Sequence, residues 1–328
     1  MARLLAILGA LWRAQRRDQK SFESVASNNF FIVTAFFLQK AGTFIYLILG
    51  LVLLFPLSTD PLRKIPPSRL SLWPLENGER RLLRILSPWV NPVTWIIAGL
   101  AVWMARGSVS IGLWAVIAGV IVIGFVLSEI PTPAHGMLRR VPQFPTMLNH
   151  LIRKNLREMF ATLDFYCALV LSLMAALYRF FGPPLPPAAL TPLTILVVLA
   201  LSSYAQCLFG LDGDGGLGRY RLLPLAGWQI LAAKDAAFLL IAIPLTLPLA
   251  PIPGLSASLV ALALGHGPSV TEHREQTRWR FSSGASVLYG FVQAAMMAMA
   301  AANDQRLVLP SAILAWAVSL FYYGRRFR

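Results

Sequence analysis

The sequence predicts an all-α fold, a polytopic integral membrane helix bundle of about eight to nine transmembrane segments with an N-terminal interfacial amphipathic helix. Two observations predict this class. First, 57% of the 328 residues are hydrophobic and only 13% are charged, whereas a soluble chain needs polar residues on nearly every element. Second, apolar runs close to the ~20 residues that a helix needs to cross a bilayer recur from residue 29 to the C-terminal end.

The first 28 residues predict an amphipathic helix that lies in the cytoplasmic membrane interface. Apolar residues recur at helical spacing: Leu4, Leu8, Leu11 and Trp12. Basic residues follow them: Arg13, Arg16, Arg17 and Lys20. A signal peptide would carry its charge before the apolar stretch and end in a small-residue cleavage site, so we expect an interfacial helix with its basic end near anionic headgroups. A cytosolic tail is the alternative.

Residues 29–328 are expected to form the transmembrane domain. The first apolar run covers 30–57, and a second apolar block, 92–130, divides into two crossings at Arg106 and Gly107. Further crossings are predicted at regular intervals along the rest of the chain: 160–181, 189–208, 231–250, 254–268, 284–302 and 306–324.

The connections between these crossings fall into two sets by charge. Most of the Lys and Arg residues lie in four loops, near 58–91, 131–158, 211–230 and 271–280, and at the C-terminal end. The turns near 106, 182–187, 251–254 and 303–305 hold few. An even number of crossings separates successive basic loops, so the basic set is expected on the cytoplasmic side.

The first apolar run is harder to place. The N-terminal segment and the 58–91 loop are both basic, yet a single crossing by 30–57 would put them on opposite sides. A hairpin that crosses twice needs roughly 40 residues, which is more than this run provides. The run therefore either crosses once, against the charge rule, or re-enters the membrane.

The net charge of +15 does not indicate nucleic-acid binding. The basic residues lie in the gaps between apolar runs, where membrane topology places them, and not in one patch. Cys167 and Cys207 both fall inside apolar segments, where a thiol is expected to be a small packing residue and not part of a disulfide or a metal site.

Ionisable residues inside a bilayer are costly and usually functional. Lys40 and Asp164 are the clearest intramembrane polar candidates, because the other charged residues in or near apolar runs lie at predicted segment ends: Glu129, Glu158, Arg179, Lys234 and Asp235. Snorkelling to the interface explains residues at such ends. A carrier driven by protons or sodium needs carboxylates or histidines near the midplane, so this distribution suggests that energy enters from elsewhere.

No motif predicts a cofactor or a metal. Residues 213–218 match G-x-G-x-x-G, but no strand precedes them, and Arg219 and Tyr220 replace the Lys and Ser/Thr of a phosphate-binding loop. Asp212 and Asp214 suggest a calcium loop, but Leu223 occupies its twelfth position, where such a loop needs Glu. The four histidines show no metal-ligand spacing: His135, His150, His266 and His273. We expect a flexible glycine-rich loop, no cofactor, no ATPase activity of the chain's own and no catalytic residue.

Two cytoplasmic loops resemble each other. Residues 71–84 and 221–234 each contain an apolar pair, a Pro-Leu, a polar turn and a basic residue ten positions after the proline. Pro224 is expected to start a short helix, as proline does well at a first helical position. These two similar loops suggest that one half of the chain is a duplicate of the other, as found in transporters. The alternative is a chance similarity between proline-containing loops.

Several short stretches resemble permease subunits of bacterial type-2 ATP-binding-cassette exporters. They are residues 151–157, 208–213, 221–225, 230–234, 265–270 and 280–284, so the likeness covers roughly 70 to 284. The resemblance implies a multi-pass subunit of the bacterial cytoplasmic (inner) membrane. It also implies pairing with a second permease copy or paralogue and with cytosolic ATPase subunits, on which short cytoplasmic helices dock.

The function implied by this resemblance is substrate export, powered by ATP hydrolysis in the partner subunits. The chain would then not itself be an enzyme. The residues expected to couple it to the ATPases lie in the two similar loops: Pro74, Glu76, Glu79, Arg80, Arg81, Pro224, Trp228 and Lys234. Two alternatives stay open, a membrane-embedded lipid or glycan transferase that uses the 271–280 loop and a non-transporting membrane scaffold.

Overall fold

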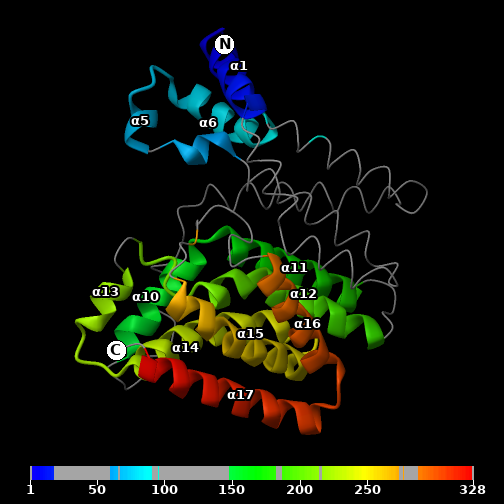
Figure 1. The fold of residues 1–328 in the computed structure, drawn as a ribbon. Coiled ribbons are helices and arrows are strands. Elements are labelled where there is room, and N and C mark those ends of the chain that lie inside the picture. The colour runs from blue at the N-terminus through cyan, green and yellow to red at the C-terminus, as the bar shows by residue number, and fades with distance from the viewer. Residues whose placement is uncertain are drawn as a thin grey trace. The chain divides into compact units, whose positions relative to one another are not determined.

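The computed structural model describes residues 2–17, 60–65, 67–90, 95, 148–181, 187–213, 216–272, 276 and 287–326. Every regular element within these ranges is a helix (Figure 1). The described residues belong to two compact units: those within 2–17 and 60–95 form the first, and those within 148–326 form the second. Each unit is described by itself. Lys40 and the predicted apolar runs 30–57 and 92–130 lie outside the described residues, apart from Trp95.

The first unit consists of short helices around a small apolar core. Its elements are α1 (Ala2–Arg17), the 3-10 helix η1 (Pro61–Lys64), α5 (Pro67–Ser71), α6 (Asn77–Leu86) and the 3-10 helix η2 (Ser87–Val90). Leu4 and Leu11 of α1 are buried together with Leu62, Leu75 and Leu83. The apolar stripe of α1 therefore packs in part against α6 and its neighbours. The position of α1 in a membrane interface stays a prediction.

The loop before α6 is held by local hydrogen bonds. Glu79 accepts a hydrogen bond from the backbone N–H of Glu76 at 3.3 Å, which satisfies a donor at the helix start. Arg80 donates to the carbonyls of Leu75 at 3.0 Å and Trp73 at 3.2 Å. Glu76, Glu79 and Arg80 thus shape the loop in which the sequence places coupling residues.

The second unit is a bundle of longer helices (Figure 1). Its elements are α10 (Asn149–Phe160), α11 (Leu163–Phe181), α12 (Pro187–Gln206), α13 (Gly216–Arg221), α14 (Gly227–Thr246), α15 (Pro251–Thr271), α16 (Val287–Ala302) and α17 (Gln305–Arg326). Each crossing predicted after residue 158 corresponds to one of these helices, and most helix ends lie within about three residues of the predicted ones. The largest difference is α14, which begins at Gly227, whereas 231 was expected.

Three helices of the described part are long and apolar enough to cross a membrane: α11, α14 and α17. Shorter apolar helical stretches occupy Leu190–Gln206 and Tyr289–Ala302. The fold is therefore a helical bundle whose apolar helices indicate a membrane protein. The prediction of eight to nine crossings depends in part on residues that the structure does not describe.

Helix α15 lies at the centre of this bundle and contacts α12, α14, α16 and α17. Small residues permit this close packing, as they do in membrane helix interfaces. At Gly265, a Cβ atom would lie 1.9 Å from the carbonyl oxygen of Ala205 on α12. At Gly254, a Cβ would lie 2.5 Å from the hydroxyl of Thr246 at the end of α14. Only glycine fits at these two contacts without a shift of the neighbouring chain.

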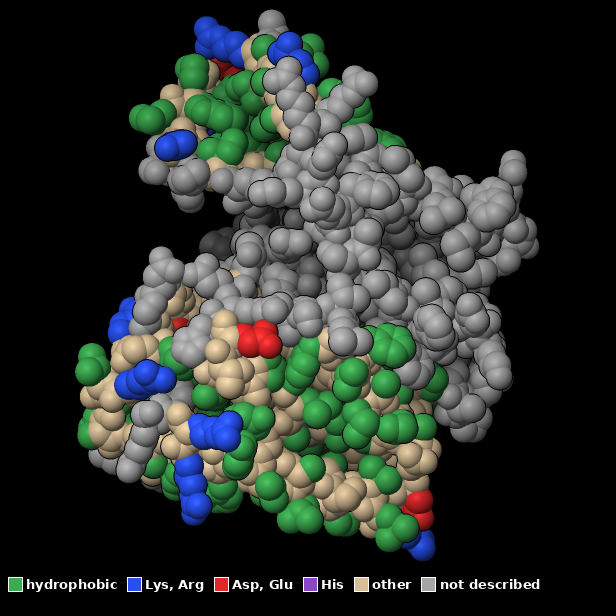
Figure 2. Space-filling model, viewed as in Figure 1, with side chains coloured by type: hydrophobic (Ala, Val, Ile, Leu, Met, Phe, Trp, Pro, Cys, Tyr) green, Lys and Arg blue, Asp and Glu red, His purple; other side chains and the backbone are tan. Residues whose placement is uncertain are grey.

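The connections of the bundle lie at two opposite ends of α14. At one end, the backbone N–H of Gln276, after α15, donates to the carbonyl of Gly210, after α12, at 3.0 Å. At the other end, Arg179 of α11 donates to the carbonyl of Leu249, after α14, at 2.7 Å. The connections after α12 and α15 therefore meet at one end, and the end of α11 meets the connection after α14 at the other. Figure 2 shows the Lys and Arg side chains of this unit mainly at the end where α10 and α13 lie.

Candidate functional site

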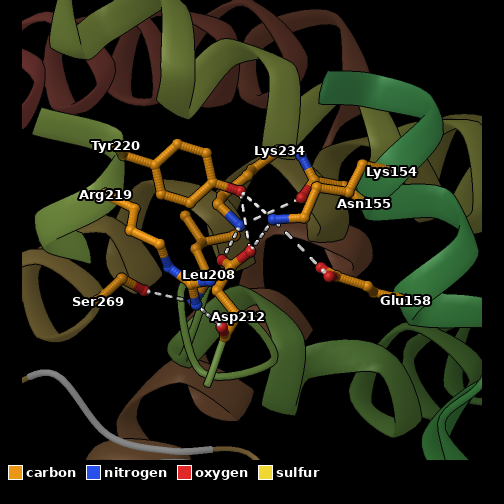
Figure 3. A network of polar contacts seen from close by, with 9 residues as sticks. All are labelled: Lys154, Asn155, Glu158, Leu208, Asp212, Arg219, Tyr220, Lys234 and Ser269. Carbon is orange, nitrogen blue, oxygen red and sulfur yellow. Dashed lines mark hydrogen bonds and ion pairs between the residues drawn. The ribbon is translucent and has the colours of Figure 1, made fainter. Parts of the chain in front are cut away.

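A buried ion-pair network joins the short helices α10 and α13 to the long helix α14, and it centres on Asp212 (Figure 3). Asp212 follows α12 in a tight turn, in which Gly213 has a positive φ of 73°. Its Oδ2 atom lies 2.8 Å from Nζ of Lys234 on α14. Its Oδ1 atom accepts hydrogen bonds from Nζ of Lys154 on α10 and, at 2.9 Å, from the hydroxyl of Tyr220 on α13. Four segments therefore meet on one carboxylate.

Lys234 is a deeply buried member of this Asp212 network, with 1% of its side chain exposed. Besides the ion pair, its ammonium donates to Oδ1 of Asn155 at 3.2 Å. It also lies 4.8 Å from the ring centroid of Phe209 and 5.1 Å from that of Tyr220. A buried charge is tolerated only when it is paired and hydrogen-bonded, and these four neighbours provide that environment.

The formal charges in the Asp212 network balance. Lys154 lies 3.8 Å from Glu158 one helical turn away, in addition to its bond to Asp212. The network therefore contains two ammonium groups, on Lys154 and Lys234, and two carboxylates, on Asp212 and Glu158. A balanced set of charges lets the polar residues be buried at the end of an apolar bundle without a large net charge.

The ion pairs shift the proton affinities of the groups that lie outside the apolar helices. Burial alone would raise the pKa of Asp212, but the ammonium groups of Lys234 and Lys154 outweigh burial and hold this pKa below its ordinary value. Burial opposes the charge on Lys154, yet its bonds to Asp212 and Tyr220 raise its pKa. Burial and the neighbouring Asp212 carboxylate raise the pKa of Tyr220. At neutral pH the carboxylate is thus ionised and the phenol is neutral.

A cavity of about 210 Å³ adjoins the Asp212 network. Its walls combine apolar, cationic and polar residues: Leu151, Lys154, Asp212, Gly216, Arg219, Tyr220 and Leu223. Arg219 is exposed and donates from one nitrogen to the backbone carbonyl of Asp212 at 2.6 Å. The cavity is large enough for a side chain of another protein or for a small polar molecule. Its walls include the exposed ends of two basic residues.

A second polar cluster lies inside the bundle, between α14, α15 and α17. Nε2 of His266 lies 3.0 Å and 3.2 Å from the two carboxylate oxygens of Asp235. Trp316 donates from its indole N–H to Asp235 at 2.8 Å. Nδ1 of His266 lies 2.9 Å from the hydroxyl of Ser319. The side chains of His266 and Asp235 are 0% and 1% exposed, so this pair is buried, whereas Trp316 and Ser319, the other members of this His266 cluster, are partly exposed.

The positions of Lys234 and Asp235 correct the sequence analysis. Both were expected at a segment end with their charges in the interface, but both are buried in the interior of α14. The expectation failed because α14 begins at Gly227, which places the two residues in its third turn. The expectation that charged residues other than Lys40 and Asp164 lie at segment ends is therefore wrong for Lys234 and Asp235, and Asp235 faces His266 of α15.

Asp164 is buried and accepts a hydrogen bond at 2.9 Å from the side chain of Gln276. It stands in the first turn of α11, at the bundle end that carries the Asp212 network, and not near the middle of a span. Gln276 belongs to the 271–280 loop in which a transferase site was considered. Residues 273–275 and 277–280 lie outside the described residues.

The 211–230 segment is more ordered than the expected glycine-rich loop. Residues Gly216–Arg221 form α13, and Pro224 does not start a short helix but stands in a bend between α13 and α14. Gly227 and Trp228 are instead the first residues of α14. Trp228 is 39% exposed, and its ring packs 5.7 Å from that of Phe321 on α17.

The two loops that resemble each other in sequence also share local structure. In each, a long or amphipathic helix begins three residues after the proline, at Asn77 after Pro74 and at Gly227 after Pro224. In each, the third helical residue accepts a hydrogen bond from the backbone N–H of the residue before the helix. For the second loop this bond joins Ala226 to Gln229 at 2.9 Å. Pro74, Glu76 and Arg81 are exposed in the first unit.

Sequence reasoning missed Asp212 and His266 as site residues. Asp212 was considered only as part of a calcium loop, yet its carboxylate is occupied by Lys154 and Lys234. Within the part of the chain that the structure describes, no group of three or more His, Cys, Asp or Glu residues is arranged to hold a metal ion. Comparison with protein-family models, curated proteins and solved structures gives no match.

Proposed function

We propose that this chain is the membrane permease subunit of an ATP-binding-cassette exporter, driven by ATP hydrolysis in cytosolic partner subunits. One observation carries the proposal: apolar residues are exposed on the connector between α13 and α14, at the end of the bundle that is rich in Lys and Arg. Leu222 is 85% exposed, Leu223 is 38% exposed, and Trp228 follows in the first turn of α14. Exposed apolar residues on a polar surface are typical of protein interfaces.

The connector, residues 222–228, is firmly attached to the transport helices. Helix α13 precedes it and is held through Tyr220 to Asp212, and Asp212 is held to Lys234 in the third turn of α14. At the same end, a Cβ atom on Gly324 of α17 would lie 2.6 Å from Cα of Trp228, so α17 packs directly on the start of α14. A displacement of the connector by a partner would therefore move α14 and α17 together.

This arrangement supports a division of labour between subunits. The partner ATPases would supply the force, and the Asp212 network would transmit it into the bundle as a rigid joint. The exposed apolar side chains of α17, such as Leu314 at 65% and Val318 at 60%, would face lipid or a second permease copy. A lipid or glycan transferase and a non-transporting scaffold remain the alternative proposals. Neither alternative requires an ATPase partner.

The test is to isolate the tagged chain from its native membrane in mild detergent and to measure Mg²⁺-dependent ATP hydrolysis. We expect hydrolysis in the intact complex and none above background once every other polypeptide has been removed. Hydrolysis by the stripped chain, or a complex without any nucleotide-binding subunit, would contradict the proposal.

Two matched variants locate the coupling surface. Trp228→Ala should reduce the amount of co-purified ATPase several-fold, because large aromatic residues dominate interface energies. Phe321→Ala removes the partner ring that contacts Trp228 within the bundle and serves as the control for lost packing. Equal ATPase recovery with both variants, at equal membrane insertion, would exclude the connector as the docking surface.

A further inference from the structure

The His266 cluster can be analysed by counting protons. The hydroxyl of Ser319 has one proton and two neighbours, the carbonyl oxygen of Ala263 at 2.6 Å and Nδ1 of His266 at 2.9 Å. A carbonyl oxygen only accepts hydrogen bonds, so the hydroxyl proton points to Ala263. The contact on the other side is then a hydrogen bond only if Nδ1 of His266 carries a proton and donates it to Ser319.

The contact between His266 and Asp235 needs a second proton. Nε2 lies 3.0 Å and 3.2 Å from the two carboxylate oxygens, and two lone pairs at that distance would repel each other. Trp316 donates to the same carboxylate, so its indole proton cannot serve this contact. The proton lies either on Nε2, which gives an imidazolium–carboxylate pair, or on Asp235, which gives two neutral groups. In both arrangements the pair has no net charge.

We propose that Asp235 and His266 form a proton-binding site inside the bundle, which holds one shared proton in this conformation and joins α17 to α14 and α15. The proposal does not rest on the proposed export function. A buried ionisable residue in a membrane helix marks a functional site by default, together with its partner. The site binds a proton and, through Ser319 and Trp316, connects proton binding to the position of α17.

Loss of the shared proton would open the His266 cluster. It would leave a carboxylate and an imidazole lone pair in contact where neither can reach solvent, since both side chains are at most 1% exposed. An unpaired buried charge is costly. The least costly response is for α17 to move away and admit water, which couples proton release to a change in helix packing.

The neighbouring elements contribute few other ionisable groups to this cluster. Lys234, next to Asp235 on α14, directs its ammonium to Asp212. Tyr204 on α12 lies close enough to interact electrostatically with both Asp235 and Asp212, and its buried hydroxyl has no hydrogen-bond partner among the described residues. On α16 the hydroxyl of Tyr289 donates to the carbonyl of Leu264, and α17 also carries Tyr323 beside Gly267 of α15. Among the described residues, the cluster thus has one ionisable pair, and the Tyr204 phenol interacts electrostatically with both this pair and Asp212.

The experiment that tests the proposal reads the protons directly, by nitrogen NMR of the full-length protein with ¹⁵N-labelled histidine. The signal that disappears in His266→Gln identifies the ring. We expect Nδ1 of His266 to be protonated at neutral pH and Nε2 to share a proton with a carboxyl group. A neutral ring with its proton on Nε2 and none on Nδ1 would overturn the proposal, and this measurement needs no variant at the other positions.

Discussion

Removal of the Asp212 carboxylate should be among the most damaging single substitutions at the basic end of the bundle. Asp212→Asn leaves the ammonium of Lys234, with a side chain that is 1% exposed, without its ion-pair partner. Breaking a buried ion pair by removing one partner costs about 3–5 kcal/mol. For a folding unit of this size, that loss corresponds to a decrease of roughly 6–20 °C in the midpoint of thermal unfolding.

Substitution of the two lysines should give a graded result. Lys154 is 46% exposed on its side chain, so Lys154→Met should cost only about 1 kcal/mol, because solvent screens and replaces the lost contact. Lys234→Met should fall between the two, since Asp212 keeps its bond to Lys154. The expected order of destabilisation is therefore Asp212→Asn, then Lys234→Met, then Lys154→Met.

The double variant Asp212→Asn/Lys234→Met tests the reasoning most sharply. It removes the carboxylate together with the ammonium that would be left unpaired, so it should be no less stable than Asp212→Asn alone. The assay is thermal unfolding in detergent, followed by the monodisperse fraction that remains after heating. Additive losses in the double variant, or a loss for Lys154→Met equal to that for Asp212→Asn, would refute the assignment of Lys234 as the buried partner.

Three further predictions follow from other features of the bundle. Gly265→Ala should destabilise the protein by about 1–3 kcal/mol or more, because the new methyl group meets the backbone of α12. Gly218→Ala is the control and should be neutral in the same unfolding assay, because nothing lies within 4 Å of the Cβ atom that it adds. Because the pKa of Asp212 is held below its ordinary value, its contribution to stability should be present above about pH 4 and be lost as the pH falls through the lowered value. Asp212→Asn should therefore flatten the acid side of the plot of stability against pH. An unchanged acid side would contradict the ion pair. Single cysteines at Leu222 and Ile252 should be labelled from opposite sides of the membrane by an impermeant thiol reagent; labelling of both from outside intact cells would contradict the topology.

The helices of the bundle could be predicted from the sequence because their cause is local. A segment in hydrocarbon must satisfy every backbone N–H and C=O within itself, so an apolar run of sufficient length is a helix whatever packs beside it. The run predicted at 306–324 is α17, Gln305–Arg326. The alternation of basic and neutral connections likewise follows from charge and chain order alone, and it agrees with the two ends defined by the contacts of Gly210 and Arg179.

The start of α14 could not be predicted as well, because its first turn contains polar and small residues that are equally typical of a loop. The structure includes Gly227, Trp228 and Gln229 in the helix, since Gln229 accepts the hydrogen bond of the Ala226 backbone N–H. This difference of one turn decided whether Lys234 was interpreted as an interfacial or a buried residue.

The sequence by itself determined that the chain is a bundle of apolar helices, the approximate positions of the long helices after residue 158 and the charge of their connections. Only the tertiary structure decided the partners of the polar residues. Lys234 and Asp235 are consecutive, but successive residues of a helix point about 100° apart, so one faces Asp212 and the other faces His266. Asp212 lies 58 residues from Lys154 and 22 from Lys234. Such pairs depend on which helices pack together. That packing depends on how closely helix surfaces fit, as where Gly265 lies against α12, and no local sequence pattern encodes this fit.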